Sequence, residues 1–347
     1  MKSKISISPQ FVLRLALWAV ILWFLSSYYL PEISNYLSGL FNFPFDWDPY
    51  EGFTVSNARL MREGISPYGD IFSFPFVSYP YPPLYPAIVA IIGGSPAREL
   101  FAARFISISS FVIILFVLVC ICRRLGLGIE GGISGAILLL TNIDCAIWFP
   151  LARVDMLCIC FTLTAVLMAE KAGSEGERGP FYWILALVML FLGLLTKHLV
   201  LPLFVIALIY GLAKKDYRKH TTRFVLALLP FTAMFLLAFK SHIFESLTVS
   251  SITAVSLDRV FTFFTAGLKQ YPVIYSGFIG LAFLITKRGI FTPFTLFAAF
   301  CLFQFLMAGH GVSLLAYLVP KYCLSMRWQD QEGISSHGFS VSKMPDH

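Results

Sequence analysis

The chain has 347 residues, of which 58% are hydrophobic and only 13% are charged, and its formal net charge is +7. Soluble domains have roughly half apolar and a quarter charged residues, so this composition excludes an ordinary soluble protein and predicts a membrane protein. The basic residues lie in loops between apolar segments, so we interpret the positive charge as a signal of membrane topology. We expect no nucleic-acid partner.

Apolar segments long enough to cross a bilayer as helices recur along the chain. They predict an all-α, polytopic transmembrane helical bundle with about 9–10 spans. The expected spans are residues 11–30, 101–122, 131–149, 156–170, 181–196, 198–213, 223–240, 271–286 and 290–309, with a tenth beginning at Gly311 if there are ten. Residues 1–325 are treated as one transmembrane domain, and the polar tail 326–347 is predicted to be disordered.

The basic residues make alternate loops positive. They are Arg123 and Arg124, Lys171 and Arg178, the cluster “KKDYRKHTTR”, and Lys287 and Arg288. With the N-terminus in the cytoplasm, these loops all face inward, as the positive-inside rule requires. Residues 31–100 then form a long first outer loop, and the turns near 150–155 and 197–198 face the same side. We expect a multi-pass protein of the plasma or inner membrane, with its candidate active site on the outer face.

The first outer loop contains the acid-bearing stretch “FDWDPYEGFTVSNARLMREG”. Asp48, Pro49 and Glu51 fit the N-cap, N1 and N3 positions of a helix from about 49 to 63, and Gly64 supplies its stop. One interpretation is that the two acids only cap this helix. The other is functional, because a loop of about 70 residues that is rich in aromatic residues is usually functional if it is not disordered.

Four motifs follow one another along the chain. They are “DPYEG” with the “AR”, “G” and “PY” after it, “YPPLYP” leading into an “AR” at the second span, “LARVDMLCICFTLTAVLMAE”, and “GLLTKHLVLPLFVIAL”. This order resembles the integral-membrane C-type (GT-C) glycosyltransferases, in the protein-mannosyltransferase-like and aminoarabinose-transferase-like branch, over roughly residues 10–240. The resemblance implies inverting transfer of a sugar from a polyprenyl-phosphate carrier to a glycan, lipid or protein acceptor on the outer side of the membrane.

Such a transfer requires a base for the acceptor hydroxyl and cations for the departing phosphate. We predict that Asp48 is the general base and that Glu51 and Asp155 are the other catalytic acids. The candidate contacts to phosphate or substrate are Arg59, Tyr81, Arg153, Lys197 and His198. The carboxylates of Asp48, Glu51 and Asp155, together with that of the more solvated Asp46, could also hold a divalent metal ion, so metal dependence stays open.

Each candidate residue also has a structural interpretation. Arg153 and Asp155 could form a local salt bridge at a helix end. Lys197 could extend to lipid headgroups, and Arg59 could belong to a solvated helix face. Tyr81 lies in a proline-rich and tyrosine-rich segment that could be a rigid interfacial element. Some relatives have a lysine directly before the double proline where this chain has Tyr81.

Two rival functions remain open from the sequence. A transporter or lipid flippase places ionisable groups near the bilayer midplane and often has repeated halves, and neither feature is evident here. A shortened, non-catalytic relative of the enzyme is the second rival, because related chains usually continue through more membrane helices. The sequence does not reveal the sugar or the acceptor, since pocket shape selects both.

Overall fold

The structure, a computed structural model, describes residues 9–68, 79–141 and 143–239. The regular elements of these residues are all helical, as predicted. In chain order they are α1 (Pro9–Phe24), the π-helical turn η1 (Leu25–Tyr29), α2 (Leu30–Asn42), α3 (Pro49–Arg62), α4 (Leu84–Gly93), α5 (Pro96–Arg124), α6 (Gly128–Thr141), α7 (Ile143–Trp148), α8 (Val154–Ser174), the short turn η2 (Gly176–Arg178), α9 (Gly179–Thr196), the short turn η3 (His198–Val200), α10 (Leu201–Ala213) and α11 (Lys215–Phe239). The predicted spans 271–286 and 290–309 and the tail 326–347 lie outside the described residues.

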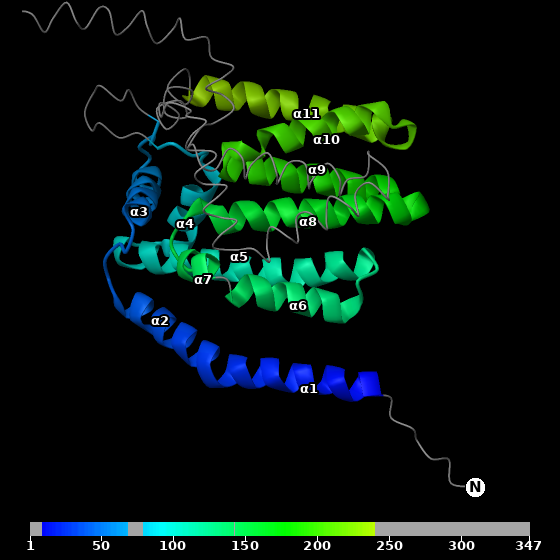
Figure 1. Cartoon of the computed structure of the whole chain (residues 1–347). Coiled ribbons are helices and arrows are strands. Elements are labelled where there is room, and N and C mark those ends of the chain that lie inside the picture. The colour runs from blue at the N-terminus through cyan, green and yellow to red at the C-terminus, as the bar shows by residue number, and fades with distance from the viewer. Residues whose placement is uncertain (1–8, 69–78, 142, 240–347) are drawn as a thin grey trace, which may run out of the picture.

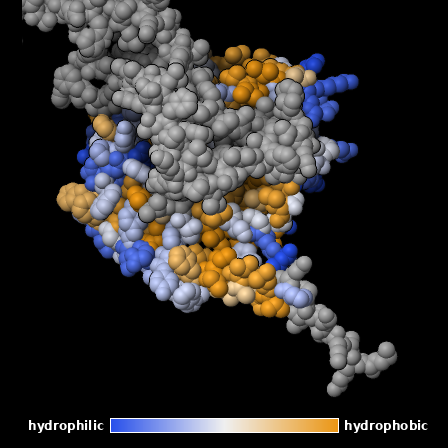
Figure 2. Space-filling view, in the orientation of Figure 1, coloured by the Kyte–Doolittle hydropathy of each residue, from blue (hydrophilic) through white to orange (hydrophobic). Residues whose placement is uncertain are grey.

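Four helices of the described part are long and apolar enough to cross a membrane. They are Val12–Asn42, Arg98–Arg124, Val154–Ser174 and Gly176–Thr196, and shorter apolar helices lie at Leu84–Gly93, Gly128–Thr141 and His198–Ala213. Figure 2 shows hydrophobic surface over the visible helices and hydrophilic residues gathered toward their ends. Large apolar side chains such as Phe116 and Ile209 are exposed, which suits contact with lipid. The described residues therefore form a helical membrane bundle.

The bundle has two different ends (Figure 1). Helices α5, α6, α8, α9, α10 and α11 lie side by side, and the chain reverses direction from each to the next. Helices α3, α4 and α7 gather at one end, together with the start of α8 and the end of α9. The basic loops around residues 125–127, 175–178 and 214 lie at the opposite end. This separates the candidate chemistry from the basic loops, as predicted, while the side of the membrane that each end faces stays a prediction.

A buried cluster holds the elements at the candidate-site end together. Ala58 of α3, Tyr85 of α4 and Ala103 of α5 are fully buried there, and they pack with Ala152 and Val154 at the start of α8. The two alanines of α3 and α5 have no side chain beyond the β-carbon, which allows these helices to approach closely. The apolar burial of this cluster thus joins the first outer loop to the turn that precedes α8.

The first helix extends beyond its predicted end at residue 30. It continues through the π-helical turn Leu25–Tyr29 into α2, which ends at Asn42, so the first outer loop begins later than predicted. Figure 1 shows a bend between α1 and α2. A π-turn and Pro31 in the first turn of α2 both interrupt regular helical hydrogen bonding, which explains the bend. The hydroxyl of Tyr36 donates to the Ile147 carbonyl of α7 at 2.9 Å and so fixes α2 beside the site.

Helix α3 matches its predicted extent. Asp48 occupies the N-cap position with extended backbone, Pro49 is the first helical residue, and Gly64 follows the C-terminus at φ 75°. The amide of Ile65 donates to the Leu60 carbonyl at 2.8 Å and that of Gly64 to Met61 at 3.1 Å, which is a Schellman motif. The predicted capping box does not form: the Asp48 side chain makes no capping hydrogen bond, and Glu51 accepts from the amide of Trp47.

Helices α5 and α6 approach closely at Gly132. A β-carbon at this position would lie 2.8 Å from the Val119 α-carbon, whereas one at Gly135 would lie 3.7 Å from the end of the Leu118 side chain. We expect Gly132→Ala to lower the free energy of unfolding by about 1–3 kcal/mol, because the backbones of α5 and α6 must move apart to make room for the methyl group. Thermal unfolding in detergent measures the effect, with Gly135→Ala as the matched control. Equal stability of the two variants would contradict this packing.

Candidate functional site

Four charged side chains from three separate parts of the chain meet at one end of the bundle. Asp48 Oδ2 lies 2.8 Å from Nη1 of Arg153. The Nε of Arg153 lies 3.2 Å from Oδ2 of Asp155, and the Nζ of Lys197 lies 2.6 Å from Oδ1 of the same carboxylate. The charges therefore alternate in an unbroken series, which we call the charged network. The predicted convergence of Asp48, Arg153 and Lys197 is a feature of the structure.

The local backbone explains why these residues can meet. Asp48 and Arg153 are the extended N-cap residues of α3 and α8, and Lys197 is the extended residue at which α9 ends. Asp155 follows in the first turn of α8. A side chain at a helix end projects beyond the packed helix surface, so three such ends can bring four charged groups together without burying charge in the middle of a span.

Aromatic rings surround both cations. The Arg153 guanidinium carbon lies 4.7 Å from the ring centroid of Tyr50 and 4.7 Å from that of Trp148. The Nζ of Lys197 lies 5.7 Å from the ring centroid of Tyr81, which places this predicted residue in the site. Ring faces attract cations and leave the charge free to bind an anion. The aromatic residues thus help to hold the cations in place without neutralising their charge.

The carboxylates keep both cations charged. Burial alone lowers the pKa of Arg153, but the charges of Asp155 and Asp48 outweigh it and raise that pKa. Burial also opposes the charge on Lys197, and the adjacent Asp155 carboxylate raises the pKa of Lys197 above its ordinary value. Both residues are therefore cationic throughout the physiological range, which suits them to bind a phosphate.

Glu51 lies beside this network but contacts different partners. Its carboxylate is fully buried and accepts hydrogen bonds from Arg104 Nε at 3.0 Å and Arg104 Nη2 at 2.9 Å. It also accepts from the amides of Trp47 and Ala152, each at 2.7 Å. Because both oxygens are engaged twice, Glu51 ties the segment before α3 to α5 and to the turn that carries Arg153.

Arg104 completes this connection and was not among the predicted site residues. It lies on α5, its side chain is 2% exposed, and its guanidinium also donates to the carbonyls of Leu40, Phe43 and Phe45. One arginine thus fixes the whole turn between α2 and α3. Arg104 lies in an apolar stretch of the sequence, and an arginine inside a membrane span requires partners. This pattern was the signal that could have identified it as a site residue.

Another polar contact fixes the backbone of Arg153. The hydroxyl of Ser107, which is fully buried on α5, donates to the Arg153 carbonyl at 3.3 Å. The Tyr85 hydroxyl of α4 lies 2.8 Å from the Ser107 hydroxyl and 2.8 Å from the Ala103 carbonyl. Helices α4 and α5 together therefore set the position of the residue at the centre of the charged network.

The ionisation of Glu51 makes stability depend on pH. Burial by itself raises the pKa of Glu51, but the hydrogen bonds from Arg104, Ala152 and Trp47 bring it below its ordinary value of 4.5. The ionised form thus stabilises the fold above that value, and the stabilisation is lost as the pH falls through the depressed pKa. We expect the difference in melting temperature between the wild type and Glu51→Gln to shrink as the pH falls from about 7 to about 3. A constant difference would contradict an ionised Glu51.

The structure does not bring Arg59 into the charged network. Its Nε lies 3.6 Å from Glu99 of α5, which is fully buried and also pairs with Arg62. These contacts join the end of α3 to the start of α5. His198 lies directly after Lys197, is buried, and its Nδ1 has no hydrogen-bond partner among the described residues. Asp46 is exposed, with its carboxylate beside Gly52.

The sequence leaves open whether a divalent metal ion binds. In the part of the chain that the structure describes, no group of three or more His, Cys, Asp or Glu side chains could hold a metal ion. Glu51 is occupied by its four hydrogen bonds, and Asp155 bridges two cations. The carboxylates at this end of the bundle are therefore arranged around arginine and lysine.

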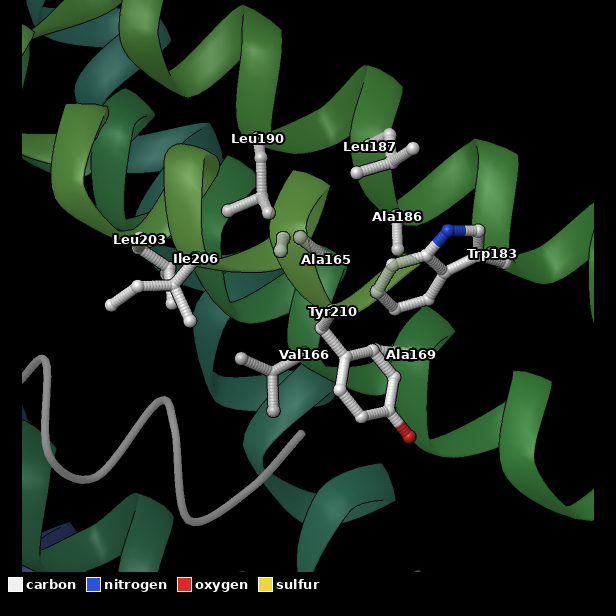
Figure 3. Close-up of a pocket in the computed structure, with 11 residues that line it drawn as sticks. Ala165, Val166, Ala169, Trp183, Ala186, Leu187, Leu190, Leu203, Ile206 and Tyr210 are labelled. Carbon is white, nitrogen blue, oxygen red and sulfur yellow. The ribbon is translucent and has the colours of Figure 1, made fainter. Parts of the chain in front are cut away.

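A narrow apolar cavity lies between α8, α9 and α10, deeper in the bundle (Figure 3). Its lining includes Ala165, Leu190 and Leu203, with Trp183 and Tyr210 toward the opposite end. The cavity volume is about 30 Å³. This space is a small gap in the packing of the helices. It lies away from the charged network.

Residues 80–245 match the family model described as dolichyl-phosphate-mannose-protein mannosyltransferase. Over this segment the chain is similar to the GT-C mannosyltransferases. No curated protein and no solved structure matches it in the corresponding comparisons. The matched segment contains Arg104, Arg153, Asp155 and Lys197, whereas Asp48 and Glu51 precede it. In the structure, two acids that precede the matched segment thus contact arginines within it.

Proposed function

We propose that the chain is a membrane glycosyltransferase that moves a sugar from a polyprenyl-phosphate carrier to a glycan, lipid or protein acceptor on the outer face of the membrane, with inversion. The family match supports a multi-pass membrane glycosyltransferase of the GT-C kind. The single observation that carries the finer proposal is the contact of Asp48 with Arg153, 2.8 Å apart although 105 residues separate them in the sequence.

The residues of the charged network supply the groups that this reaction needs. Arg153 and Lys197 hold the phosphate of the donor, and the charge that develops on the phosphate as the sugar departs is stabilised there. Asp48 accepts the proton of the acceptor hydroxyl. Asp155 keeps the two cations together, because its two oxygens bind one each. Tyr81 lines the site beside Lys197.

Attack from the face opposite the phosphate inverts the anomeric carbon in a single step. The acceptor oxygen forms the new bond to that carbon, and the bond between the carbon and the phosphate oxygen breaks. The electron pair leaves with the phosphate, and the acceptor proton passes to Asp48. No covalent sugar–enzyme intermediate is required, so one base and two cations suffice.

The test is transfer of a labelled sugar from polyprenyl-phosphate donors by the full chain reconstituted in lipid vesicles. We expect label to move to an acceptor in the membrane or at its outer face, and to require the phosphate-linked donor. Vesicles without the chain provide the background. Absence of transfer with every lipid-phosphate sugar would favour the non-catalytic relative, and movement of the intact donor across the bilayer without transfer would favour the flippase.

A further inference from the structure

We infer that the phosphate of the donor displaces the Asp48 carboxylate from Arg153, so that donor binding frees the base for the acceptor. This inference rests on the proposed function and adds an order of binding to it. Its starting point is that Asp48 is already engaged: Oδ2 lies 2.8 Å from Nη1 of Arg153. A carboxylate oxygen that accepts a hydrogen bond from a guanidinium must leave that partner before it can take the proton of the acceptor hydroxyl.

The two partners of this ion pair are held unequally. Arg153 is retained by the Asp155 carboxylate at 3.2 Å and by the rings of Tyr50 and Trp148, whose centroids each lie 4.7 Å from its guanidinium carbon. The Asp48 side chain makes no capping hydrogen bond, and Arg153 is its hydrogen-bond partner among the described residues. When an anion competes for the guanidinium, Asp48 is therefore the group that moves away and Arg153 stays in place.

The charge balance leads to the same result. Two carboxylates and two cations make the charged network neutral, and a phosphodiester donor adds one negative charge. Asp155 binds both cations, whereas Asp48 binds only one within the described residues. The extra charge thus leaves Asp48 without a cation and next to an anion. Transfer of the acceptor proton to Asp48 then relieves the excess negative charge.

The donor can reach the contact that it replaces. The side chain of Arg153 is 20% exposed and that of Lys197 is also 20% exposed, although Asp48 covers part of the guanidinium. An arginine binds phosphate through two parallel N–H donors, and one of them is the group that Asp48 occupies. Asp48 therefore occupies a position that suits a phosphate oxygen, and the donor must bind before the acceptor reacts.

The test is the affinity of the full chain in lipid nanodiscs for a polyprenyl monophosphate. If Asp48 competes for Arg153, Asp48→Asn binds this lipid about five- to tenfold more tightly than the wild type. Asp46→Asn, which removes the same charge from an exposed residue two positions earlier, binds like the wild type. The uncharged polyprenol binds all three proteins equally. Unchanged or weaker binding of the phosphate by Asp48→Asn would overturn the inference.

A second variant and a separate readout keep this test decisive. Asp48→Ser removes the charge but keeps a good N-cap residue for α3, so it provides the same measurement if the asparagine variant does not fold. Sugar transfer is measured in parallel. Loss of transfer without tighter binding would overturn the competition and leave Asp48 as the base. Tighter binding with full transfer would establish the competition and overturn the proposed base.

Discussion

Replacing Asp48 by asparagine is expected to lower the rate of sugar transfer by about 10²- to 10⁴-fold, the usual contribution of a general base. Asparagine keeps the size of the side chain and an N-cap residue for α3, so the fold is retained. The measurement is the rate of label transfer at saturating donor, in membranes with equal amounts of each variant. The loss appears in the rate and not as weaker donor binding, because Asp48 does not hold the donor.

Asp46→Asn is the matched control for this prediction. It removes one negative charge from the same loop, but Asp46 is exposed and lies outside the charged network. We expect its transfer rate to equal that of the wild type. Equal rates in all three proteins would exclude Asp48 as the base, and equal losses in both variants would show that only the charge of the loop matters.

Replacing Arg104 by alanine is expected to lower the free energy of unfolding by about 3–5 kcal/mol, because it leaves the Glu51 carboxylate buried without its partner. Arg104 and Glu51 are 2% and 0% exposed, so water cannot replace the lost hydrogen bonds without opening the site. The three carbonyls of the turn before α3 lose their donor as well. Thermal or denaturant unfolding in detergent measures the effect.

Arg98→Ala provides the comparison, since Arg98 is an exposed arginine near the start of the same helix. Its expected effect on stability is below about 0.5 kcal/mol. The double variant Arg104→Met with Glu51→Leu removes both charges at once and is expected to recover part of the stability. A stability of Arg104→Ala within experimental error of the wild type would contradict the positioning assigned to Glu51.

Much of the fold follows from the sequence because apolar length and turn residues are local signals. The hydropathy of 156–170 and 181–196 predicts α8 and α9, and Asp48-Pro49 with Gly64 predicts α3 to within a residue. The extension of the first helix to Asn42 was missed, since Pro31 and Glu32 in its second half resemble the beginning of a loop. Proline is accepted there because the π-turn already interrupts the hydrogen bonding.

The candidate site also has one part that the sequence predicts and another that it does not. Asp48, Arg153, Asp155 and Lys197 lie in the motifs that resemble the GT-C glycosyltransferases and at the ends of helices, and the position of a helix end can be read locally. The sequence could not predict that Glu51 and Asp48 contact different partners. Two side chains three positions apart on one helix can either share a site or make separate contacts. The direction of Glu51 is set by Arg104, a residue of another helix.

The most direct measurement of the central claim is a structure of the full chain with a polyprenyl-phosphate sugar bound. We predict the phosphate within hydrogen-bond distance of Arg153 and Lys197, the Asp48 carboxylate released from Arg153, and the anomeric carbon between Asp48 and the phosphate. A phosphate bound away from both cations, with Asp48 still paired to Arg153, would contradict the claim.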